Sequence, residues 1–458
     1  MASSSFLFLI HLFCGMFMLR SRLMEAQSNH NISLGSTLSP LGPQKSWQSP
    51  SGDFSFGFLR IRDDERFLLA IWFDKTDPKT VVWSATNLSA TREMALKVTA
   101  DAQLVLTHAQ LVLTDGQNSV LWNTTGDSDD VVSHAAMLDD GNFVLARPDG
   151  SLRWQSFEYP TDTLLPGQSL LPGNKLQSMD TGYLHRRFEL HLRVEANGSD
   201  LSLYAITTPS GSSYGFYWSV STSNIATQLC FQQSRLVLVL MNESVINITS
   251  PSPETETDDK VYQRATLGDD GVFRHYVHPK NNATMGWKTV AYVPKEICQS
   301  VFTYGSWICG FNSYCKRDNE NIECKCPPQY SYLDHNRKFG GCKQDFSSQS
   351  CDVDESSMFE LQAMVNVDWP LSDYDHFQPM KEEDCKEACL TDCLCAAVIF
   401  ENSTGDCWKK RHPMSNGRSG SFVNRTAYIK IPKPKGDLAR VATSWGYIMP
   451  QILIPNAN

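Results

Sequence analysis

The sequence predicts a mainly β protein made of several modules, with disulfide-rich modules toward its carboxyl end. Three observations support this prediction: short alternating apolar segments broken by Gly, Asp, Asn and Pro, tryptophans that recur at a regular spacing, and twelve cysteines concentrated between Cys298 and Cys407. A chain of 458 residues is too long for one ordinary core, and at about 100–200 residues per domain it should hold two to four domains. We therefore expect tandem β domains followed by small cross-linked modules.

The composition excludes several classes of function. Forty Lys and Arg against fifty Asp and Glu give a net charge of −10, which argues against a nucleic acid or an anionic membrane face as the main partner. A hydrophobic content of 41% with 20% charged residues is typical of a globular chain. No motif requires a cofactor, and we expect none.

Residues 1–26 are predicted to be a signal peptide. Phe6–Leu19 is an apolar run of signal-peptide length that is short for a membrane span. Arg20 and Arg22 follow the run instead of preceding it, and Met24 is bulky for a cleavage site, so an uncleaved anchor is the alternative. Apart from this leader we expect no membrane span, and the protein should be secreted or associated with the plasma membrane.

Nine Asn-x-Ser/Thr sequons also favour export. One sequon is a weak indication, because the tripeptide is common by chance, but nine beside a disulfide-like cysteine cluster are best explained by an exported glycoprotein. The predicted acceptors are Asn31, Asn87, Asn123, Asn197, Asn242, Asn247, Asn282, Asn402 and Asn424.

The amino-terminal half contains short predicted strands and an internal repeat. The strands include Asp53–Phe58, Phe67–Phe73, Thr80–Trp83 and Asn142–Ala146. Trp83, Trp122 and Trp154 lie 39 and 32 residues apart. A tandem copy, Asp101–Thr107 followed by His108–Thr114, adds seven residues to the first gap, so the corrected period is 32 in both cases. We expect three four-stranded units that share one core, with one copy of the heptad extruded as a hairpin or forming an extra edge, because an odd insertion would reverse the faces of a strand.

Four phrases of this half resemble the bulb-type, mannose-binding lectin domain. They are Ala70–Phe73 (AIWF), Thr80–Asn87 (TVVWSATN), Asp140–Leu145 (DGNFVL) and Trp154–Gly167 (WQSFEYPTDTLLPG). The last is a long match to the S-domain of plant S-locus glycoproteins and G-type lectin S-receptor-like kinases. The resemblance implies a β-prism of three four-stranded sheets for residues 27–163, which agrees with the repeat.

In that family the sugar pocket follows the pattern Gln-x-Asp-x-Asn-x-Val-x-Tyr. Its polar groups bond the hydroxyls of an uncharged hexose without a metal, and the valine meets the C–H face of the sugar. The best copy here keeps Asp140, Asn142 and Val144 but has Leu138 in place of Gln and Ala146 in place of Tyr. The other copy reads Thr99, Asp101, Gln103, Val105 and Thr107.

Both copies of the pocket have lost outer polar groups. At ~0.5–1.5 kcal/mol net per hydrogen bond, losing two would weaken an already weak affinity by one to two decades. Asp140 and Asn142 also suit an ordinary β-turn. We therefore do not expect tight mannose binding, and any sugar affinity should come from several sites acting together.

Residues 164–296 are expected to form a second lectin-like β unit. Gly215–Val220 and Leu236–Met241 read as strands, and Asp269–Tyr276 (DDGVFRHY) resembles a turn of the S-locus glycoprotein region. Cys230 has no obvious partner, so a buried free thiol is expected, with an intermolecular disulfide as the alternative.

Residues 297–343 contain six cysteines spaced as in an EGF-like module. The resemblance implies the disulfides Cys298–Cys315, Cys309–Cys324 and Cys326–Cys342. So small a span cannot bury enough surface to fold alone, and each bridge should contribute ~2–4 kcal/mol. The residues before Cys298 (VPKEI) do not show the set of acidic and amide residues that calcium-binding modules carry there. A zinc site ranks low in an exported chain, so we expect no metal.

Residues 351–431 resemble the PAN/apple domain of the same receptors. Cys385 and Cys389 share one face of a short predicted helix, Lys381–Leu390, and a strand at Cys395–Phe400 follows. The resemblance implies the pairs Cys385–Cys407 and Cys389–Cys395 and leaves Cys351–Cys393 as the third. Because the family uses this module for protein contacts, a homodimer or a receptor-kinase partner is expected through it.

The tail, residues 432–458, contains no apolar run of about 20 residues. No kinase Gly-rich loop, HRD or DFG phrase occurs in the chain, whereas the family normally continues into a membrane helix and a cytoplasmic kinase. We therefore expect a non-catalytic ectodomain that recognises an extracellular glycan or a secreted protein ligand. The alternative is a truncated product of a G-type lectin receptor Ser/Thr kinase.

One sequence motif could suggest a hydrolase. Gly211-Ser-Ser213-Tyr-Gly215 fits the pattern G-x-S-x-G, with Ser213 as the candidate nucleophile. A nucleophile elbow needs a helix after the serine, but Phe216–Val220 reads as a strand. A hairpin turn explains the match, and no enzyme activity is expected.

Overall fold

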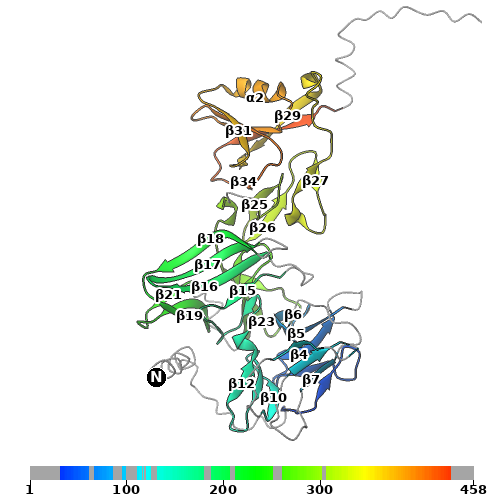
Figure 1. The fold of residues 1–458 in the computed structure, drawn as a ribbon, viewed down its shortest axis with the longest axis vertical. Coiled ribbons are helices and arrows are strands. Elements are labelled where there is room, and N and C mark those ends of the chain that lie inside the picture. The colour runs from blue at the N-terminus through cyan, green and yellow to red at the C-terminus, as the bar shows by residue number, and fades with distance from the viewer. Residues whose placement is uncertain are drawn as a thin grey trace, which may run out of the picture. The chain divides into compact units, whose positions relative to one another are not determined.

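The computed structural model describes residues 31–60, 66–85, 95–98, 111–115, 117, 120–124, 132–179, 187–206, 212–250, 260–301 and 306–434. The described chain is mainly β, which confirms the predicted fold class (Figure 1). It divides into two compact units, an amino-terminal unit that ends at Ile297 and a carboxyl-terminal unit that starts at Cys298.

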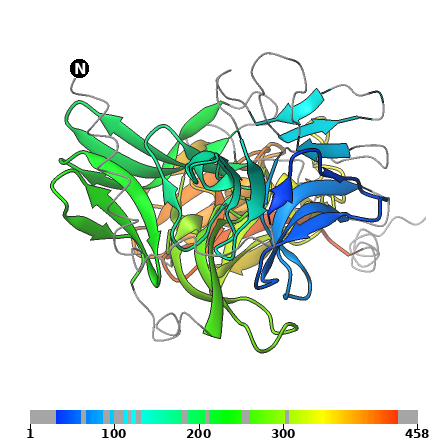
Figure 2. The same ribbon diagram turned by 90° about the horizontal axis from the view of Figure 1, so that it is seen from below.

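The first set of sheets in the amino-terminal unit consists of three four-stranded antiparallel sheets, in the orders β3-β4-β5-β6, β2-β7-β8-β9 and β1-β10-β11-β12. Figure 2 shows their blue and cyan strands on the right. The strands are β1 Ile32–Ser33, β2 Thr37–Leu38, β3 Ser46–Gln48, β4 Phe54–Arg60, β5 Phe67–Phe73, β6 Thr80–Ser84, β7 Ala95–Val98, β8 Leu111–Thr114, β9 Val120–Asn123, β10 His134–Met137, β11 Phe143–Ala146 and β12 Leu152–Gln155. The chain gives one short strand to each sheet and then returns to the sheets in reverse order with three consecutive strands each. This is the expected β-prism.

The three tryptophans of the repeat meet inside this first set. Their ring centroids lie 6.0 Å apart for Trp83 and Trp122, and 6.1 Å apart for each of the other two pairs, all edge to face. Each occupies the same place in its sheet: Trp122 pairs with Leu113 and Trp154 pairs with Leu145 on the neighbouring strand. The predicted three-fold repeat is therefore present, and one tryptophan from each sheet builds its centre.

The register of the second sheet shows which copy of the heptad forms a strand. Strand β8 comes from the second copy, and its Leu111 pairs with Val98 of β7. The intervening residues 99–110, which include the first copy, lie outside the described residues. The second copy therefore supplies the strand, and the hairpin or extra edge expected for the other copy falls on residues that the structure does not describe.

A second set of three four-stranded sheets follows, in the orders β15-β16-β17-β18, β14-β19-β20-β21 and β13-β22-β23-β24. Three short strands again visit the sheets before three consecutive strands return to each in reverse order. The strands are β13 Thr163–Leu164, β14 Ser169–Leu170, β15 Lys175–Gln177, β16 Phe188–Glu195, β17 Gly198–Ile206, β18 Ser213–Thr222, β19 Ala226–Gln232, β20 Arg235–Leu240, β21 Val245–Asn247, β22 Val261–Leu267, β23 Phe273–Pro279 and β24 Lys288–Val293. The unit is thus a tandem of two prisms with one topology.

Aromatic side chains join the two prisms into one unit. Phe73 of the first prism lies 5.0 Å from Tyr262 and 5.1 Å from Trp287 of the second, between ring centroids. The Tyr262 hydroxyl donates to Asp53 Oδ1 at 2.8 Å, and Trp287 Nε1 donates to a side-chain hydroxyl of the first prism at 2.8 Å. The prisms therefore share a core and should unfold together.

The second prism contains a buried histidine that should make stability depend on pH. His275 is fully buried; its Nε2 lies 2.9 Å from Gln263 Oε1, and its Nδ1 has no partner among the described residues. Burial lowers the pKa of His275 to about 4. Because the unfolded chain binds the proton more readily, stability should fall as pH decreases from about 6.5 to 4, by about 3 kcal/mol in total.

Thermal melts across this range should show that His275→Asn removes this loss, and that the half-buried control His134→Asn keeps it. An unchanged pH profile in His275→Asn would contradict the assignment.

The described part of the carboxyl-terminal unit has a five-stranded main sheet, a four-stranded sheet, a two-stranded sheet and one α-helix. The main sheet has the order β29-β35-β32-β33-β31, the second has the order β26-β25-β34-β30, and β27 pairs with β28. The strands are β25 Tyr314–Asp318, β26 Asn321–Lys325, β27 Tyr330–Tyr332, β28 Cys342–Gln344, β29 Phe359–Val365, β30 Val367–Asp368, β31 Asp373–Phe377, β32 Ala397–Glu401, β33 Asp406–Lys410, β34 Gly417–Ser419 and β35 Thr426–Pro432. Helix α2 is Glu382–Leu390, and short 3₁₀ turns occupy Ser156–Glu158, Ile297–Gln299, Lys338–Gly340 and Ser356–Met358.

The predicted helix is confirmed, and its cysteines fix it to the main sheet. Cys385 and Cys389 are its buried residues, and three acidic residues occupy its first turn, where the helix dipole favours them. Cys385 is bonded to Cys407 of β33, and Cys389 to Cys395. The helix is therefore held by covalent bonds more than by a wide apolar face.

Six disulfides join the same pairs that the family resemblance implies. They are Cys298–Cys315, Cys309–Cys324, Cys326–Cys342, Cys351–Cys393, Cys385–Cys407 and Cys389–Cys395. The prediction for Cys230 is wrong: this residue is fully buried, as expected, but it is disulfide-bonded and is not a free thiol.

Candidate functional site

The turn between β10 and β11 places the predicted sugar residues. Gly141 has φ +89°, and a Cβ there would lie 2.4 Å from Leu165 Cδ1, so this position requires glycine. The Asn142 backbone N–H donates to Asp140 Oδ1 at 2.9 Å, and Asp139 Oδ1 accepts from the Ser51 N–H at 2.8 Å. Asp140 is an exposed residue, but burial of its carboxyl group raises the pKa of that group to about 6, and the carboxylate closes the turn by accepting the Asn142 N–H.

Asn142 faces the interior of the prism. It is only 4% exposed, and its Nδ2 donates to Gln155 Oε1 at 2.8 Å. Its Oδ1 accepts from Ser156 Oγ at 3.1 Å and from the Phe157 N–H at 3.2 Å. The amide thus holds the end of β12 against the turn and leaves one donor hydrogen for any other partner.

The remaining positions of this copy add little polarity. Val144 and Ala146 are buried, and Leu138 is half-buried and takes part in the turn through its backbone N–H. The structure brings Asp140, Asn142 and Val144 together on one hairpin, but only Asp140 offers an exposed polar side chain. A neutral sugar would therefore meet one carboxylate and few further groups.

The second predicted copy cannot be placed in the same way. Asp101, Gln103 and Val105, with Thr99 and Thr107, lie outside the described residues. Because Leu113 pairs with Trp122 as Leu145 pairs with Trp154, Val112 is the residue of β8 that corresponds to Val144. The sequence pattern could not distinguish the two heptads, since both read AQLVLT.

The second prism has an equivalent turn that the sequence interpretation did not treat as a site. Asp270 and Gly271 stand between β22 and β23 as Asp140 and Gly141 stand between β10 and β11. Gly271 also has positive φ, +82°, and a Cβ there would lie 2.9 Å from a ring carbon of Phe188. The shared Asp-Asp-Gly triplet was the signal that could have located this turn.

Here an arginine occupies the position that corresponds to Val144. Arg274 Nη1 donates to Asp270 Oδ1 at 2.8 Å, and Nη2 to Oδ2 at 2.5 Å, with both residues buried. Burial alone would lower the pKa of Arg274, but the hydrogen bonds and charge of Asp270 outweigh it and raise this pKa. Because the carboxylate is already bidentately paired, this turn has no free acid with which to hold a sugar.

The candidate nucleophile Ser213 is not in an elbow. It is the first residue of β18, a ten-residue strand, and it pairs with Ile206 of the preceding antiparallel strand. No helix follows it. Among the described residues no cluster of three His, Cys, Asp or Glu side chains could hold a metal ion, and no helix is both long and apolar enough to span a bilayer.

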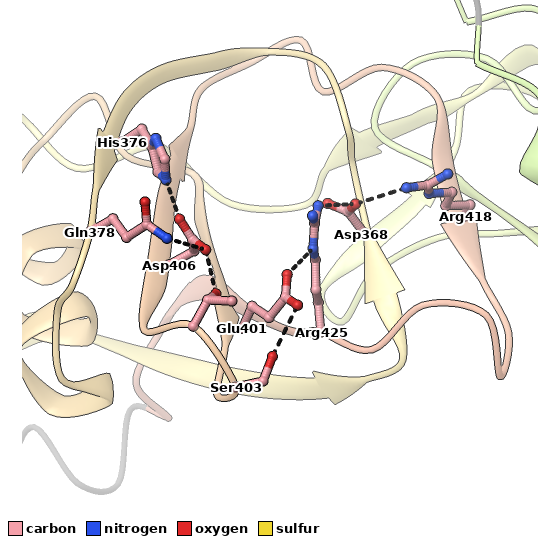
Figure 3. Close-up of polar contacts among 9 residues, drawn as sticks. Asp368, His376, Gln378, Glu401, Ser403, Asp406, Arg418 and Arg425 are labelled. Atoms are coloured by element: carbon pink, nitrogen blue, oxygen red, sulfur yellow. Dashed lines mark hydrogen bonds and ion pairs between the residues drawn. The ribbon is translucent and has the colours of Figure 1, made fainter.

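A second group of charged side chains lies in the carboxyl-terminal unit (Figure 3). Asp368 is fully buried and accepts from Arg425 Nη1 at 2.9 Å and Arg418 Nη2 at 3.4 Å. Arg425 Nε also donates to Glu401 Oε2 at 3.1 Å. Each charged group faces an opposite charge, so this network joins β30, β32, β34 and the residue that precedes β35.

Trp408 lies beside this network between two side chains. The His376 ring stacks on it at 5.0 Å with an interplanar angle of 4°, and the Arg425 guanidinium lies 4.2 Å from its ring centroid. His376 Nε2 is 2.6 Å from Asp406 Oδ1 (Figure 3). Two side chains of the chain itself therefore pack on the indole, which indicates a structural role.

Comparison with known proteins agrees with these observations. A family profile described as D-mannose binding lectin matches residues 80–180. The chain is 41% identical over 441 residues to the G-type lectin S-receptor-like serine/threonine-protein kinase LECRK1 of Oryza sativa subsp. japonica, with 92% of this chain and 53% of the relative covered. It is 33% identical over 429 residues to the protein of the same description named RLK1 of Arabidopsis thaliana, with 88% and 50% covered.

Among solved structures, a monomeric monocot mannose-binding lectin from Gastrodia elata is 20% identical to this chain, with 28% of this chain and 96% of that chain covered and a TM-score of 0.20. The chain spans about half the length of the curated relatives it matches. The tandem prisms, the lectin profile and an identity that extends over about nine-tenths of this sequence agree with one another. The chain belongs to the plant G-type lectin S-receptor-like kinase family.

Proposed function

We propose that this chain is a non-catalytic ectodomain that recognises an extracellular glycan or secreted protein ligand. The observation that supports this most directly is the pair of prisms with one topology, of which the first carries the lectin profile. A prism presents sheet faces and hairpin turns on a rigid core, which suits binding more than chemistry. The region 351–431, which resembles the PAN domain, would supply contacts to a second receptor chain.

Exposure of the sequons supports an extracellular location. Asn123 is half-buried, and the other seven acceptors within the described residues are exposed. These seven are Asn31, Asn197, Asn242, Asn247, Asn282, Asn402 and Asn424. Accessible acceptors and six disulfides together suit a protein that matures in an oxidising compartment.

Sugar recognition by the first prism would be weak. Among the predicted sugar positions that the structure describes, Asp140 is the one exposed polar residue, and Asn142 is committed to Gln155, Ser156 and Phe157. A few solvent-exposed hydrogen bonds contribute about 0.5–1.5 kcal/mol each, which is far from the free energy of micromolar binding. We therefore infer that glycan binding, where it occurs, uses several copies of the protein on one surface.

A glycan array probed with a multivalent form of the secreted protein tests this proposal. We expect a weak signal on mannose-containing glycans that falls at least ten-fold in Asp140→Asn, because the exposed carboxylate loses its charge while the turn keeps its acceptor. Asn142→Ala should abolish the signal and also lower thermal stability, since the amide is a buried anchor. Asp149→Ala is the matched control, because this carboxylate bonds only Ser151 in the next turn. An array without signal for the unchanged protein would rule out direct sugar binding and leave a protein ligand.

A further inference from the structure

A small pocket lies in the carboxyl-terminal unit. It has a volume of about 30 Å³, which is room for about two water-sized groups. Its wall comes from the segment after β28, the start of β29, the loop between α2 and β32, and Lys430 on β35. These parts lie far apart in sequence, and folding of this unit brings them together.

Lys430 gives the pocket an unusual positive charge. The residue is 4% exposed, and its Nζ donates to Cys389 O at 2.8 Å and to Asp392 O at 2.9 Å. Two of the three ammonium hydrogens are thus used by carbonyls near the carboxyl end of α2. No carboxylate of the described residues lies within 4 Å of Nζ. A lysine this buried is rarely left without a counter-ion.

Gln349 adds a second unsatisfied group to the same wall. It is 9% exposed, and its Oε1 has no hydrogen-bond partner among the described residues. A buried acceptor without a partner costs about 1–3 kcal/mol. A ligand that donates one hydrogen bond here and places an anion near Lys430 would satisfy both groups.

The rest of the wall is mixed: Gln344, Ser348 and His412 contribute polar groups, and aromatic and aliphatic side chains cover another part of it. Phe346 and Phe359 line the pocket, and Leu394 at its edge is 60% exposed. The Phe359 ring lies 5.7 Å from the Lys430 ammonium and limits its contact with water. An apolar side chain next to the anionic group of a ligand would therefore find a matching surface.

We propose that this pocket binds the terminal carboxylate of a peptide that ends in an apolar residue. The carboxylate accepts the third hydrogen of the Lys430 ammonium, the terminal amide N–H donates to Gln349 Oε1, and the side chain covers Phe346 and Leu394. The feature is independent of sugar binding and gives the protein a means of recognising processed peptide ends.

The charge on Lys430 sets the pH at which this binding should operate. Burial lowers the pKa of Lys430 to about 8, with Asp392 opposing the shift and Lys409 adding to it. His412 also lines the pocket, and burial lowers its pKa. Carboxylate binding should therefore be full at pH 6 and should weaken as pH rises through about 8.

Titration of the whole secreted chain with N-acetyl-leucine and N-acetyl-leucinamide tests the proposal. By calorimetry or saturation-transfer NMR at pH 6, we expect the acid to bind at least ten-fold more tightly than the amide, which lacks the carboxylate. The preference should fall at least ten-fold at pH 9.5. Equal binding of acid and amide, or no binding of the acid at concentrations on the order of 10 mM, would overturn the proposal.

Substitutions of pocket residues test whether the acid binds in this pocket. Lys430→Met and Gln349→Leu keep side-chain size and should each weaken binding of the acid at least ten-fold, whereas Lys343→Met, at an exposed lysine of the same unit, should not change it. Lys430→Met also removes two bonds to carbonyls, so Gln349→Leu tests the site should that variant fail to fold. Unchanged affinity in Gln349→Leu, or equal losses in Lys343→Met, would overturn the assignment.

Discussion

Replacing Trp83 by alanine is expected to lower the free energy of unfolding of the amino-terminal unit by about 3–5 kcal/mol. Trp83 is 5% exposed and lies edge to face with both other tryptophans of the trio. Its Nε1 also donates to Tyr159 O at 2.8 Å. Alanine would remove the contact among the three sheets, leave a cavity at their shared axis and free a carbonyl. Urea unfolding followed by far-UV circular dichroism measures the change without depending on tryptophan fluorescence.

A conservative substitution and a control substitution complete this test. Trp83→Phe keeps an aromatic ring but loses the hydrogen bond, so its cost should be roughly half that of alanine. Leu152→Ala removes a side chain that is 38% exposed on β12, close to Trp154, and should change stability by less than about 1 kcal/mol. A cost below about 1 kcal/mol for Trp83→Ala would show that the trio does not hold the prism together.

The sequence predicts the frame of the prisms well because their strands carry strong local signals. Phe67–Phe73 was expected as a strand and is β5 with the same bounds, and all seven of its residues are buried. The spacing of Trp83, Trp122 and Trp154 predicted one core, since a repeated fold places equivalent residues at equivalent depths. Short-range patterns of this kind depend on neighbours in the chain, which a sequence displays directly.

The direction of each site residue is much less predictable. The motif at Asp140–Val144 identifies residue types, but the inward turn of Asn142 depends on Gln155, Ser156 and Phe157 from the next strand and turn. A register shift between Leu145 and Ala146 lies directly after the motif, and such a bulge redirects side chains. These features come from pairing between strands, and one strand's sequence does not specify them.

Contacts between distant segments are harder still to predict. Gln349 and Lys430 line one pocket although 80 residues separate them, and neither belongs to a motif. Cys230 was predicted to be a free thiol because the sequence shows no obvious partner for it, but it is disulfide-bonded. In each case the prediction depends on a contact between residues that are distant in sequence, and the periodicity and spacing of residue types do not reveal such contacts.

The buried ion pair of the second prism leads to the other large effect. Arg274→Val would place at this position the residue type found at Val144 in the first prism, but it would leave the Asp270 carboxylate without its counter-ion. Both residues are buried, and removing one partner of such a pair costs about 3–5 kcal/mol. We expect a loss of this size in the free energy of unfolding of the amino-terminal unit, measured by urea denaturation at pH 7.

The double variant separates the loss of the pair from the cost of an unpaired charge. Asp270→Asn keeps the acceptor that bonds the Val272 N–H at 3.2 Å but carries no charge, so Asp270→Asn with Arg274→Val should recover at least half of the loss. Asp270→Asn alone leaves the guanidinium unpaired and should be costly as well. If both single changes were mild and their effects simply added, the pair would contribute no more than an exposed salt bridge. The expected non-additive result would mean that Arg274 stabilises the second prism while occupying the carboxylate that a sugar would otherwise need.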